Sequence, residues 1–260
     1  MLNGADEAAD FRPSGGGRDH TDTSTGIHRR RRELEEKRGE IMNRTKEIIS
    51  SINKLSGQFA PYDIFCDWIK ACALVIQNSC QMLHNHTWQE REKEYLQIAE
   101  KYGKDNMAEF VKMLAMLTET LETDMSDALG DIYMRAGLGN KNTGQFFTPY
   151  PVSAACAEMS IPKDIPDGIL TINEPSCGGG GMIIAAADVL KKRGINYQKR
   201  MDVVAQDLDW KGVYMCYLQL SLLGIKATVV QGDTLQYPYP SAGRTAECIF
   251  RTPAKMGLLI

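Results

Sequence analysis

The stretch INEPSCGGGGM, residues 172–182, lies between two apolar runs and decides how the rest of the sequence is interpreted. Four consecutive glycines cost backbone entropy, so a chain keeps them for flexibility or because its backbone must approach something closely. Glu174 precedes the glycines, and no lysine or arginine lies among them. This composition argues against a bound phosphate, because the nearby carboxylate would repel it.

Short apolar runs alternate with helical runs around this loop. The runs of strand length are DGILTIN (167–173), DVVAQ (202–206), KATVVQ (226–231) and AECIF (246–250). The helical runs are MIIAAADVLKKRG (182–194) and DWKGVYMCYLQLSLLG (209–224), each of which ends at a glycine. This alternation predicts an α/β fold with a parallel sheet covered on both faces. We expect the strand order 3-2-1-4, with the fourth strand as an open edge that the tail, the helical region or another chain covers.

Polar residues follow three of the predicted strands at the point where each strand ends. Glu174 follows the first strand, Asp207 the second and Asp233 the third. Right-handed crossovers bring the carboxyl ends of parallel strands to one edge, where ligands bind. Three carboxylates at one edge repel each other, so a ligand with an ammonium group, ribose hydroxyls and an exocyclic amine would account for them.

Two other nucleotide sites do not fit the spacing. A dinucleotide fingerprint needs GxGxxG with an acid about 20 residues farther on. Gly178 and Gly180 fit the first two positions, but Ile183 stands in the third and Asp207 lies too far along. A phosphate-binding loop with Gly-Lys-Ser/Thr is absent.

The N-terminal half has a different character. Residues 1–41 contain a small polar stretch and a charge run without apolar periodicity, so we expect a disordered arm. Its four arginines, 29–32, are interpreted as solvated, with phosphate contacts as the alternative. Residues 42–140 are expected to form a helical domain, since apolar residues recur at helical spacing, for example from Met107 to Leu121. Residues 141–260 would form the sheet domain.

Composition indicates a globular protein in a reducing compartment. The chain has 260 residues and a net charge of −3, so its overall charge does not indicate a nucleic-acid partner. Its seven cysteines contain no CxxC pair, which favours free thiols and a cytoplasmic location. Cys80, His84 and His86 are spaced poorly for a metal site on one helix face, so no metal is expected. No apolar run approaches the length that spans a bilayer, so no membrane partner is expected.

The motifs resemble those of S-adenosylmethionine-dependent DNA methyltransferases. The similarity is to the adenine-N6 group that includes the modification (M) subunits of type I restriction-modification systems. GQFFTP (144–149) resembles the motif ahead of that family's first strand, and EPSCGGGGM (174–182) resembles its glycine loop. AQDLD (205–209) and QGDTL (231–235) resemble the segments after strands two and three, and DALGDIYMRAG (127–137) the helix that leads in. The resemblance implies a Rossmann-like methyltransferase sheet, here cut short after strand four and preceded by a helical domain.

The resemblance also implies roles for individual residues toward S-adenosylmethionine as cofactor. Phe147, Thr148 and Pro149 would line its methionine end. Glu174 would face its ammonium group, and Asp207 would accept hydrogen bonds from its ribose hydroxyls. Leu208 would pack on the adenine ring. Asp233, with Thr234 beside it, would accept a hydrogen bond from the exocyclic amine of the adenine. The remaining expected cofactor-loop residues are Pro175, Cys177, Gly178 and Gly180, of which Cys177 is interpreted as a small packing residue and not as a nucleophile. Helix capping by Glu174 and Asp233 and core packing by Phe147 are the structural alternatives.

The family's catalytic motif, Asn/Asp-Pro-Pro-Tyr/Phe after strand four, is not recognisable. The positions in register are Arg251, Thr252, Pro253 and Ala254. Arginine only donates hydrogen bonds, so it cannot accept the hydrogens of the target amine, and alanine cannot stack on a base. YPYP (237–240) also lacks the acceptor, and it precedes strand four.

Three functions therefore remain open at the level of the sequence. The first is an adenine-N6 DNA methyltransferase of the type I M-subunit kind, with DNA as substrate and a specificity subunit, another subunit or a second copy as partner. The second is a degenerate family member that binds S-adenosylmethionine as an accessory or sensor protein. The third is methylation of a different substrate, because acids at strand ends do not by themselves select the acceptor.

Overall fold

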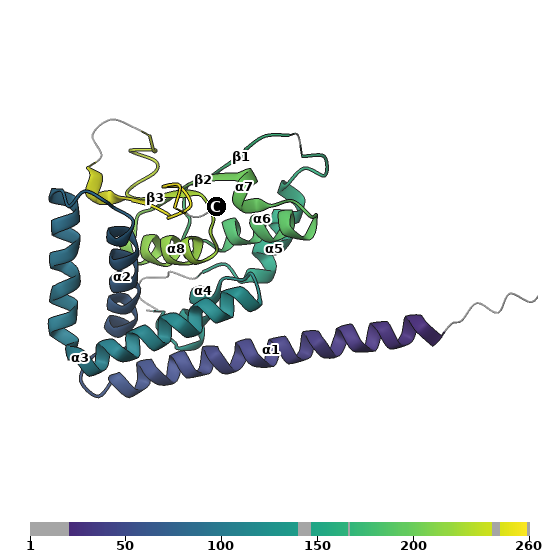
Figure 1. Ribbon diagram of the computed structural model, residues 1–260, viewed down its shortest axis with the longest axis horizontal. Helices are drawn as coiled ribbons and strands as arrows, with labels where there is room; N and C mark the ends of the chain where they lie inside the picture. The colour runs from purple at the N-terminus through teal and green to yellow at the C-terminus, as the bar shows by residue number, and fades with distance from the viewer. Residues whose placement is uncertain (1–20, 140–146, 166, 241–244, 259–260) are drawn as a thin grey trace, which may run out of the picture. The chain divides into compact units, whose positions relative to one another are not determined.

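The computed structural model describes residues 21–139, 147–165, 167–240 and 245–258 (Figure 1). The chain divides into two units, of which the first ends at Gly39 and the second spans Glu40–Ile260. The sequence predicts boundaries after residues 41 and 140, and this division stays a prediction. Within the second unit, which contains both the helices and the sheet, helix α2 packs against helix α8.

The helical part of the second unit is built on a continuous apolar core. It contains the end of α1 (Thr21–Leu55), α2 (Pro61–Ser79), α3 (His86–Thr123) and α4 (Ala128–Arg135). Trp68 of α2 is fully buried, and its indole nitrogen donates to the Phe110 carbonyl at 3.1 Å. Gly103 interrupts α3 with φ of 70°, so the predicted stripe from Met107 to Leu121 lies on the second segment of a kinked helix.

The α/β part follows the predicted alternation of strands and helices. Its elements are α5 (Tyr150–Ser160), β1 (Leu170–Glu174), α6 (Gly181–Lys192), α7 (Tyr197–Arg200), β2 (Met201–Asp207), α8 (Trp210–Leu222), β3 (Ala227–Gln231), a 3-10 turn (Ala246–Cys248) and β4 (Ile249–Arg251). Strands β1, β2 and β3 pair in parallel, with Glu174 beside Ala205 and Asp207 beside Gln231. Gly194 and Gly224 adopt positive φ just beyond α6 and α8, as the sequence predicts for helix ends. The predicted α/β class is confirmed.

The predicted position of the fourth strand is wrong. The sheet order is β1-β2-β3-β4, and β4 runs antiparallel to β3, with Val229 beside Phe250. A parallel strand needs a crossover connection, usually helical. The described residues between β3 and β4 contain only a 3-10 turn, so the chain returns in the opposite direction. As a result, the last residue of β4, Arg251, lies beside Thr228 near the start of β3.

The helical segment covers the outer edge of β4, as we expected for an open strand. Gln77 of α2 accepts a hydrogen bond from the Arg251 N–H at 2.9 Å. Arg91 of α3 donates to the carbonyls of Ala246 and Ile249, and its guanidinium lies over the Phe250 ring. These contacts supply partners for backbone groups that an edge strand leaves unpaired.

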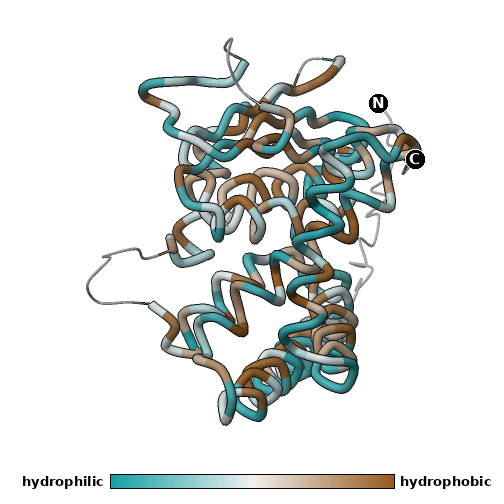
Figure 2. The backbone as a smooth tube through the Cα atoms, turned by 90° about the vertical axis from the view of Figure 1, so that its left-hand side faces the viewer, coloured by the Kyte–Doolittle hydropathy of each residue, from teal (hydrophilic) through white to brown (hydrophobic). Residues whose placement is uncertain are grey.

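The sheet is less enclosed than the sequence predicts. Figure 1 shows α5, α6 and α8 on the same side of the strands, and the hydropathy colours of Figure 2 place apolar residues along this layer. On the other side, Thr171 and Asn173 of β1 are exposed, and Asp202 and Val204 of β2 are only partly buried. The expected cover on both faces is therefore not present over β1 and β2. Within the described ranges, none of the helices combines the length and the apolar character of a membrane span.

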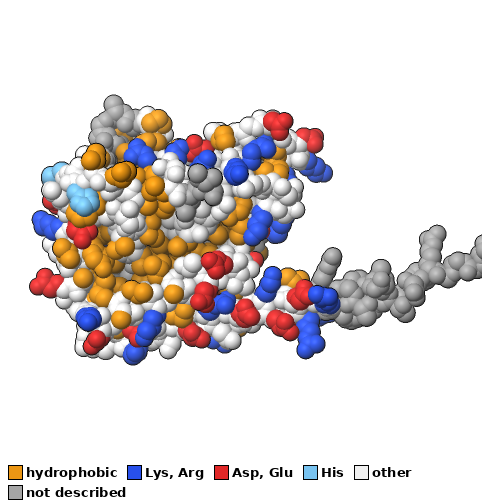
Figure 3. All heavy atoms as spheres, in the orientation of Figure 1, with side chains coloured by type: hydrophobic (Ala, Val, Ile, Leu, Met, Phe, Trp, Pro, Cys, Tyr) orange, Lys and Arg blue, Asp and Glu red, His pale blue; other side chains and the backbone are white. Residues whose placement is uncertain are grey.

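The charged segment before Glu40 is helical where the structure describes it. Residues 21–41, expected to be disordered, belong to α1, whereas residues 1–20 lie outside the described residues. Among the described residues of this segment, three i,i+4 ion pairs account for a helix without an apolar stripe: Arg29–Glu33 at 2.9 Å, Arg31–Glu35 at 3.1 Å and Arg32–Glu36 at 3.4 Å. Figure 3 shows basic and acidic side chains close together where this helix is coloured. These three arginines are therefore solvated and paired with glutamates of their own helix.

Replacing Glu33, Glu35 and Glu36 together with glutamine is expected to loosen this helix. Each pair contributes about 0.3 kcal/mol, so the loss of all three gives about 1 kcal/mol. Amide exchange of residues 29–39 should become several times faster, and raising the salt concentration should speed exchange in the wild-type segment in the same direction. Wild-type exchange that salt leaves unchanged would show that the ion pairs do not hold the helix.

Candidate functional site

The loops after β1, β2 and β3 meet at one edge of the sheet and are joined by hydrogen bonds. The Cys177 N–H donates to the Gln206 carbonyl at 2.9 Å, and the Gly232 N–H donates to the Asp207 carbonyl at 2.7 Å. Thr234 Oγ1 donates to the Pro175 carbonyl at 2.7 Å. The structure therefore brings together the residues that follow all three parallel strands, which the spacing in the sequence predicted.

The glycine loop is pressed against side chains of its own chain. Gly178 and Gly180 have φ of 49° and 90°, a region that favours glycine. A Cβ on Gly178 would lie 3.1 Å from the Phe147 ring, and one on Gly180 would lie 3.2 Å from Cys216 Sγ. At these two positions glycine is required both by the backbone conformation and by the close approach of a neighbour.

Asp207 organises the site as well as lining it. One carboxylate oxygen accepts from the Gly178 N–H at 2.7 Å, and the other accepts from the Asp209 N–H at 2.9 Å. A carboxylate has about four acceptor positions, so two remain for hydroxyl groups of a ligand. Leu208 follows directly and is 68% exposed. An exposed leucine beside a carboxylate suits a ligand that has both hydroxyls and a flat apolar ring.

Glu174 and Asp233 lie at the same edge and also hold their own turns. Glu174 accepts from the Ser176 N–H at 3.2 Å. Asp233 accepts from the N–H groups of Leu235 and Gln236 at 2.8 and 3.2 Å. Both carboxylates therefore hold turns, and neither caps a helix, since residues 175–180 and 232–237 are turns and the N-cap of α6 is Gly180. Acceptor positions remain on each carboxylate.

Phe147 connects the predicted motif to the glycine loop. It is buried, contacts Tyr133 edge-on at a ring distance of 5.2 Å, and lies against Gly178. Pro149 is the N-cap of α5, and Thr148 precedes it at an exposed position. The preceding residues of the motif, 144–146, lie outside the described residues.

Cys177 is a buried packing residue of the loop. Its thiol is hydrogen-bonded with that of Cys216 on α8, and this bond together with burial raises the pKa of Cys177 well above its ordinary value. A thiol with a raised pKa is a poor nucleophile. This geometry supports the interpretation of Cys177 as a packing residue.

The residues aligned with the missing catalytic motif lie at the opposite edge of the sheet. Thr252 Oγ1 donates to the Ile225 carbonyl at 2.7 Å and accepts from the Ala227 N–H, just before and at the start of β3. Lys255 pairs with Asp202 near the start of β2. Because β4 is antiparallel to β3, Arg251, Thr252, Pro253 and Ala254 lie at the end of the sheet opposite Glu174, Asp207 and Asp233.

A buried polar pair beneath the glycine loop was not predicted. Asp127, the N-cap of α4, is 6% exposed and accepts from the Gly130 N–H and from the Gln219 side chain. Burial raises the pKa of the Asp127 carboxyl, the two hydrogen bonds partly offset this, and nearby Asp131 raises it further. No ion pair to Asp127 occurs among the described residues.

Asp127→Asn is expected to stabilise the protein increasingly as the pH rises. The folded-state pKa of Asp127 is raised, so its contribution to stability is complete below the ordinary aspartate pKa and is lost as the pH rises through the folded-state pKa. Asparagine caps helices equally well and has no proton to lose. Thermal unfolding from pH 4 to 8 should show the variant gaining a few degrees over wild type, whereas Asp131→Asn on the exposed side of α4 should not. Parallel curves for wild type and Asp127→Asn would contradict this.

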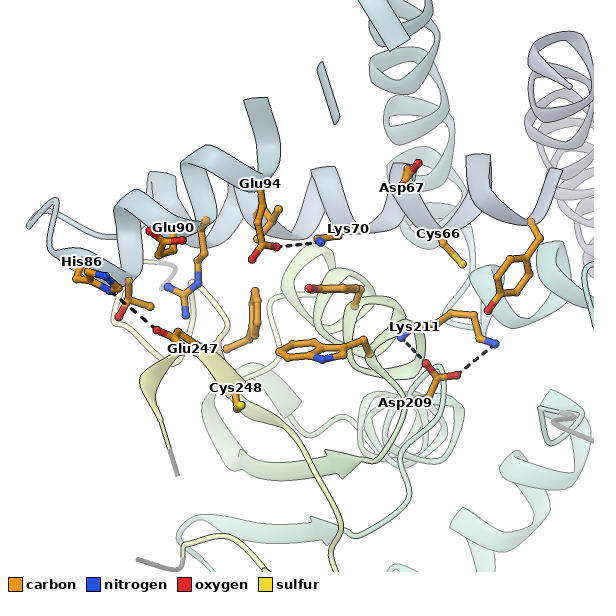
Figure 4. Close-up of a pocket in the computed structure, with 17 residues that line it drawn as sticks. Cys66, Asp67, Lys70, His86, Glu90, Glu94, Asp209, Lys211, Glu247 and Cys248 are labelled. Atoms are coloured by element: carbon orange, nitrogen blue, oxygen red, sulfur yellow. Dashed lines mark hydrogen bonds and ion pairs between the residues drawn. The ribbon is translucent and has the colours of Figure 1, made fainter. Parts of the chain in front are cut away.

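A cavity of about 640 Å³ lies between α2, α3, the start of α8 and the β4 segment (Figure 4). Trp210 and Tyr214 stack in its wall at 5.3 Å. Its charged groups are paired, with Lys70 on Glu94 at 2.9 Å and Lys211 on Asp209 at 3.4 Å. In the described residues no group of three or more histidine, cysteine or acidic side chains is placed to hold a metal ion.

Comparison with known proteins identifies the sequence pattern. A sequence model of the N-6 DNA methylase family matches residues 124–254, just over half of the chain. No curated protein matches the sequence.

Eight chains among the solved structures are similar in part, and three of them can be named. They are the type I restriction-modification system methyltransferase subunit from Streptococcus thermophilus (12% identity, 79% of this chain and 61% of that chain, TM-score 0.44), a protein described as a class I S-adenosylmethionine-dependent methyltransferase from Listeria monocytogenes (16%, 74% and 54%, 0.41) and a DrdV–DNA complex (16%, 75% and 22%, 0.33). The chain thus spans less than two thirds of each of these chains.

Proposed function

Because the chain belongs to the N-6 DNA methylase family, we propose that it binds S-adenosylmethionine where β1, β2 and β3 end, and that it acts in adenine-N6 methylation of DNA. The observation that carries the proposal is the bond between Gly178 N–H and Asp207. This bond fixes a glycine loop without side chains next to a carboxylate that retains acceptor positions. The finer assignment, to the M-subunit type of type I restriction-modification systems, rests on the motifs GQFFTP and EPSCGGGGM.

The residues at this edge fit the chemistry of the cofactor. Glu174 would attract its ammonium group, Asp207 would accept from its ribose hydroxyls, and Asp233 would accept from its adenine amine. The exposed Leu208 side chain would cover the adenine ring. No basic side chain is needed here, because the cofactor carries no phosphate, which is consistent with a loop that lacks lysine and arginine.

When bound, the cofactor supplies an electrophilic methyl group on a sulfonium. The protein's task is then to hold a flipped adenine so that the lone pair of its amine points at that methyl. This requires a hydrogen-bond acceptor and an aromatic surface beside the cofactor. No two prolines are adjacent in the sequence, so the usual motif is absent, and Arg251 lies at the other edge. We propose that a further subunit or a second copy completes the base-binding site.

The same observations support one alternative, an accessory or sensor protein that binds S-adenosylmethionine without transferring its methyl group. An intact cofactor loop beside a missing acceptor is the arrangement expected of such a protein. The two functions share the cofactor site and differ only in whether adenine is methylated.

Transfer of tritiated methyl from S-adenosylmethionine to adenine-containing DNA separates these functions. We expect saturable cofactor binding by the chain alone, and incorporation into N6 of adenine once a partner subunit is added. Arg251→Ala should not change that incorporation, because Arg251 lies away from the cofactor edge. Binding without incorporation, with every partner tried, would support the accessory function. If the chain does not bind S-adenosylmethionine, both the methyltransferase function and the accessory function are contradicted.

A further inference from the structure

We propose that Gln219 of α8 is the positioning residue of the glycine loop, holding residues 178–181 in the conformation that receives the cofactor. Its effect on a ligand rests on the proposed function, whereas its effect on the loop does not. The side chain is fully buried and contacts the loop through the Gly179 carbonyl. Nothing in the sequence marks it, since it is, like Ser221, a polar residue in the otherwise apolar run YLQLSLL (217–223).

Gln219 joins three segments that are far apart in the chain. Its amide nitrogen donates to the Gly179 carbonyl at 2.7 Å and to Asp127 at 2.8 Å. Its amide oxygen accepts from the Leu129 N–H at 3.0 Å. The side chain is fully buried, so these bonds form without competition from water. One residue therefore ties the loop to both α8 and the start of α4.

Asp127 fixes which way the Gln219 amide points. The Leu129 N–H needs an acceptor, while the Gly179 carbonyl needs a donor. The acceptor Asp127 lies on the same side of the amide as Gly179. A flipped amide would therefore place the Gln219 oxygen against the Asp127 carboxyl oxygen and the Gly179 carbonyl oxygen. Only the observed orientation satisfies all three partners.

The middle of the loop is in contact with this pair. A Cβ on Gly179 would lie 3.0 Å from an Asp127 oxygen, and one on Gly181 would lie 3.2 Å from the other oxygen. The four glycines thus have two different roles. Gly178 and Gly180 adopt positive φ, whereas Gly179 and Gly181 let the backbone settle onto Asp127 and reach Gln219.

Gln219→Met tests the role because it keeps the size of the side chain and removes every hydrogen bond. We expect faster amide exchange at Gly178 and Gly180, whose N–H groups are bonded to Asp207 and to the Cys177 carbonyl. We also expect S-adenosylmethionine affinity to fall by about 10- to 100-fold, since a buried carbonyl and a buried N–H lose their partners.

The matched control is Gln77→Met. Gln77 is also a buried glutamine, and it bonds the Arg251 N–H on β4. This variant should lose a similar amount of thermal stability and keep wild-type loop exchange and affinity. A Gln219→Met variant that is folded and exchanges at Gly178 and Gly180 as slowly as wild type would overturn the proposal.

Gln219→Glu separates positioning from packing, because it keeps the shape and exchanges the donor for an ionisable oxygen. The titratable groups around position 219 are Asp127 from α4, Cys216 one turn earlier on α8, and Cys177 from the loop. Burial raises the pKa of Asp127, and the hydrogen bond with Cys216 together with burial raises that of Cys177. The introduced carboxyl is buried beside Asp127, so it takes up a proton readily, and its O–H can then donate to Gly179.

We therefore expect Gln219→Glu to bind the cofactor at least about tenfold more weakly than wild type at pH 8 and to recover most of this loss at pH 5.5. An affinity deficit that is the same at both pH values would contradict a role for the donor. If wild type binds no S-adenosylmethionine but Gln219→Met loosens the loop, the proposed function fails and the positioning role stands. If wild type binds S-adenosylmethionine but Gln219→Met leaves amide exchange in the loop unchanged, the positioning role fails and the proposed function stands.

Discussion

Asp207→Ala is expected to weaken S-adenosylmethionine binding by about 100-fold or more, as measured by titration calorimetry. The substitution removes the acceptor for the ribose and also the bond that clamps Gly178. It leaves the N–H groups of Gly178 and Asp209 without their acceptor. Losses of this kind cost about 1 to 3 kcal/mol each, and about 1.4 kcal/mol corresponds to tenfold in affinity.

Two variants separate these contributions. Asp207→Asn keeps an oxygen for Gly178 and loses the negative charge, so its affinity should lie between those of wild type and Asp207→Ala. Asp209→Ala removes the N-cap of α8, which accepts from the Lys211 N–H, and should lower stability by about 1 kcal/mol with little change in affinity. Wild-type affinity in a folded Asp207→Ala variant would show that the ligand does not lie at this edge.

Phe250→Ala is expected to lower the free energy of unfolding by about 3 to 5 kcal/mol in urea denaturation. Phe250 on β4 is 1% exposed and packs edge-on against Tyr217 at 5.2 Å and Tyr214 at 5.7 Å. Truncation would leave a cavity between β4 and α8 and would expose the Arg91 guanidinium, which lies over the ring at 4.9 Å. The effect is large because this one side chain holds β4 to the helical layer.

A double-mutant cycle makes this a test of the strand order. Phe250→Leu alone should cost less than Phe250→Ala, since it fills part of the volume. Combined with Tyr217→Leu, the cycle should give a coupling of about 0.5 to 1.5 kcal/mol for the aromatic pair. In the order 3-2-1-4, strand four would lie beside β1 instead, so additive effects would contradict the antiparallel position of β4.

The sequence predicted the parallel strands well because that part of the fold depends on local periodicity. Apolar runs of strand length and helices ending at glycines fix β1, α6, β2, α8 and β3 in turn. The crossover rule then places Glu174, Asp207 and Asp233 at one edge without further information. The joining of these three loops by hydrogen bonds confirms that step.

The position of β4 could not be obtained in this way. The run AECIF has strand character, but its pairing depends on how residues 232–248 connect it to β3. A connection with no α-helix in its described part sends the strand back antiparallel, whereas the alternation of strands and helices predicts a parallel neighbour of β1. In the structure, Arg251–Ala254 therefore lie at the end of the sheet where β3 begins.

The two other misses have different causes. The arm before Glu40 lacks an apolar stripe, which predicts disorder, although arginine and glutamate recur there at i,i+4 spacing. That signal was present in the sequence. The Asp127–Gln219 pair had no such signal, because its members are far apart in the chain and meet only when α4, α8 and the loop pack together.

Amide exchange with and without saturating S-adenosylmethionine tests the central claim most directly. The account predicts slower exchange in residues 172–182, 205–209 and 231–235 when the ligand is present, and unchanged exchange in residues 249–257 at the opposite edge. Unchanged exchange in residues 172–182 at saturating ligand, or protection confined to residues 249–257, would contradict it.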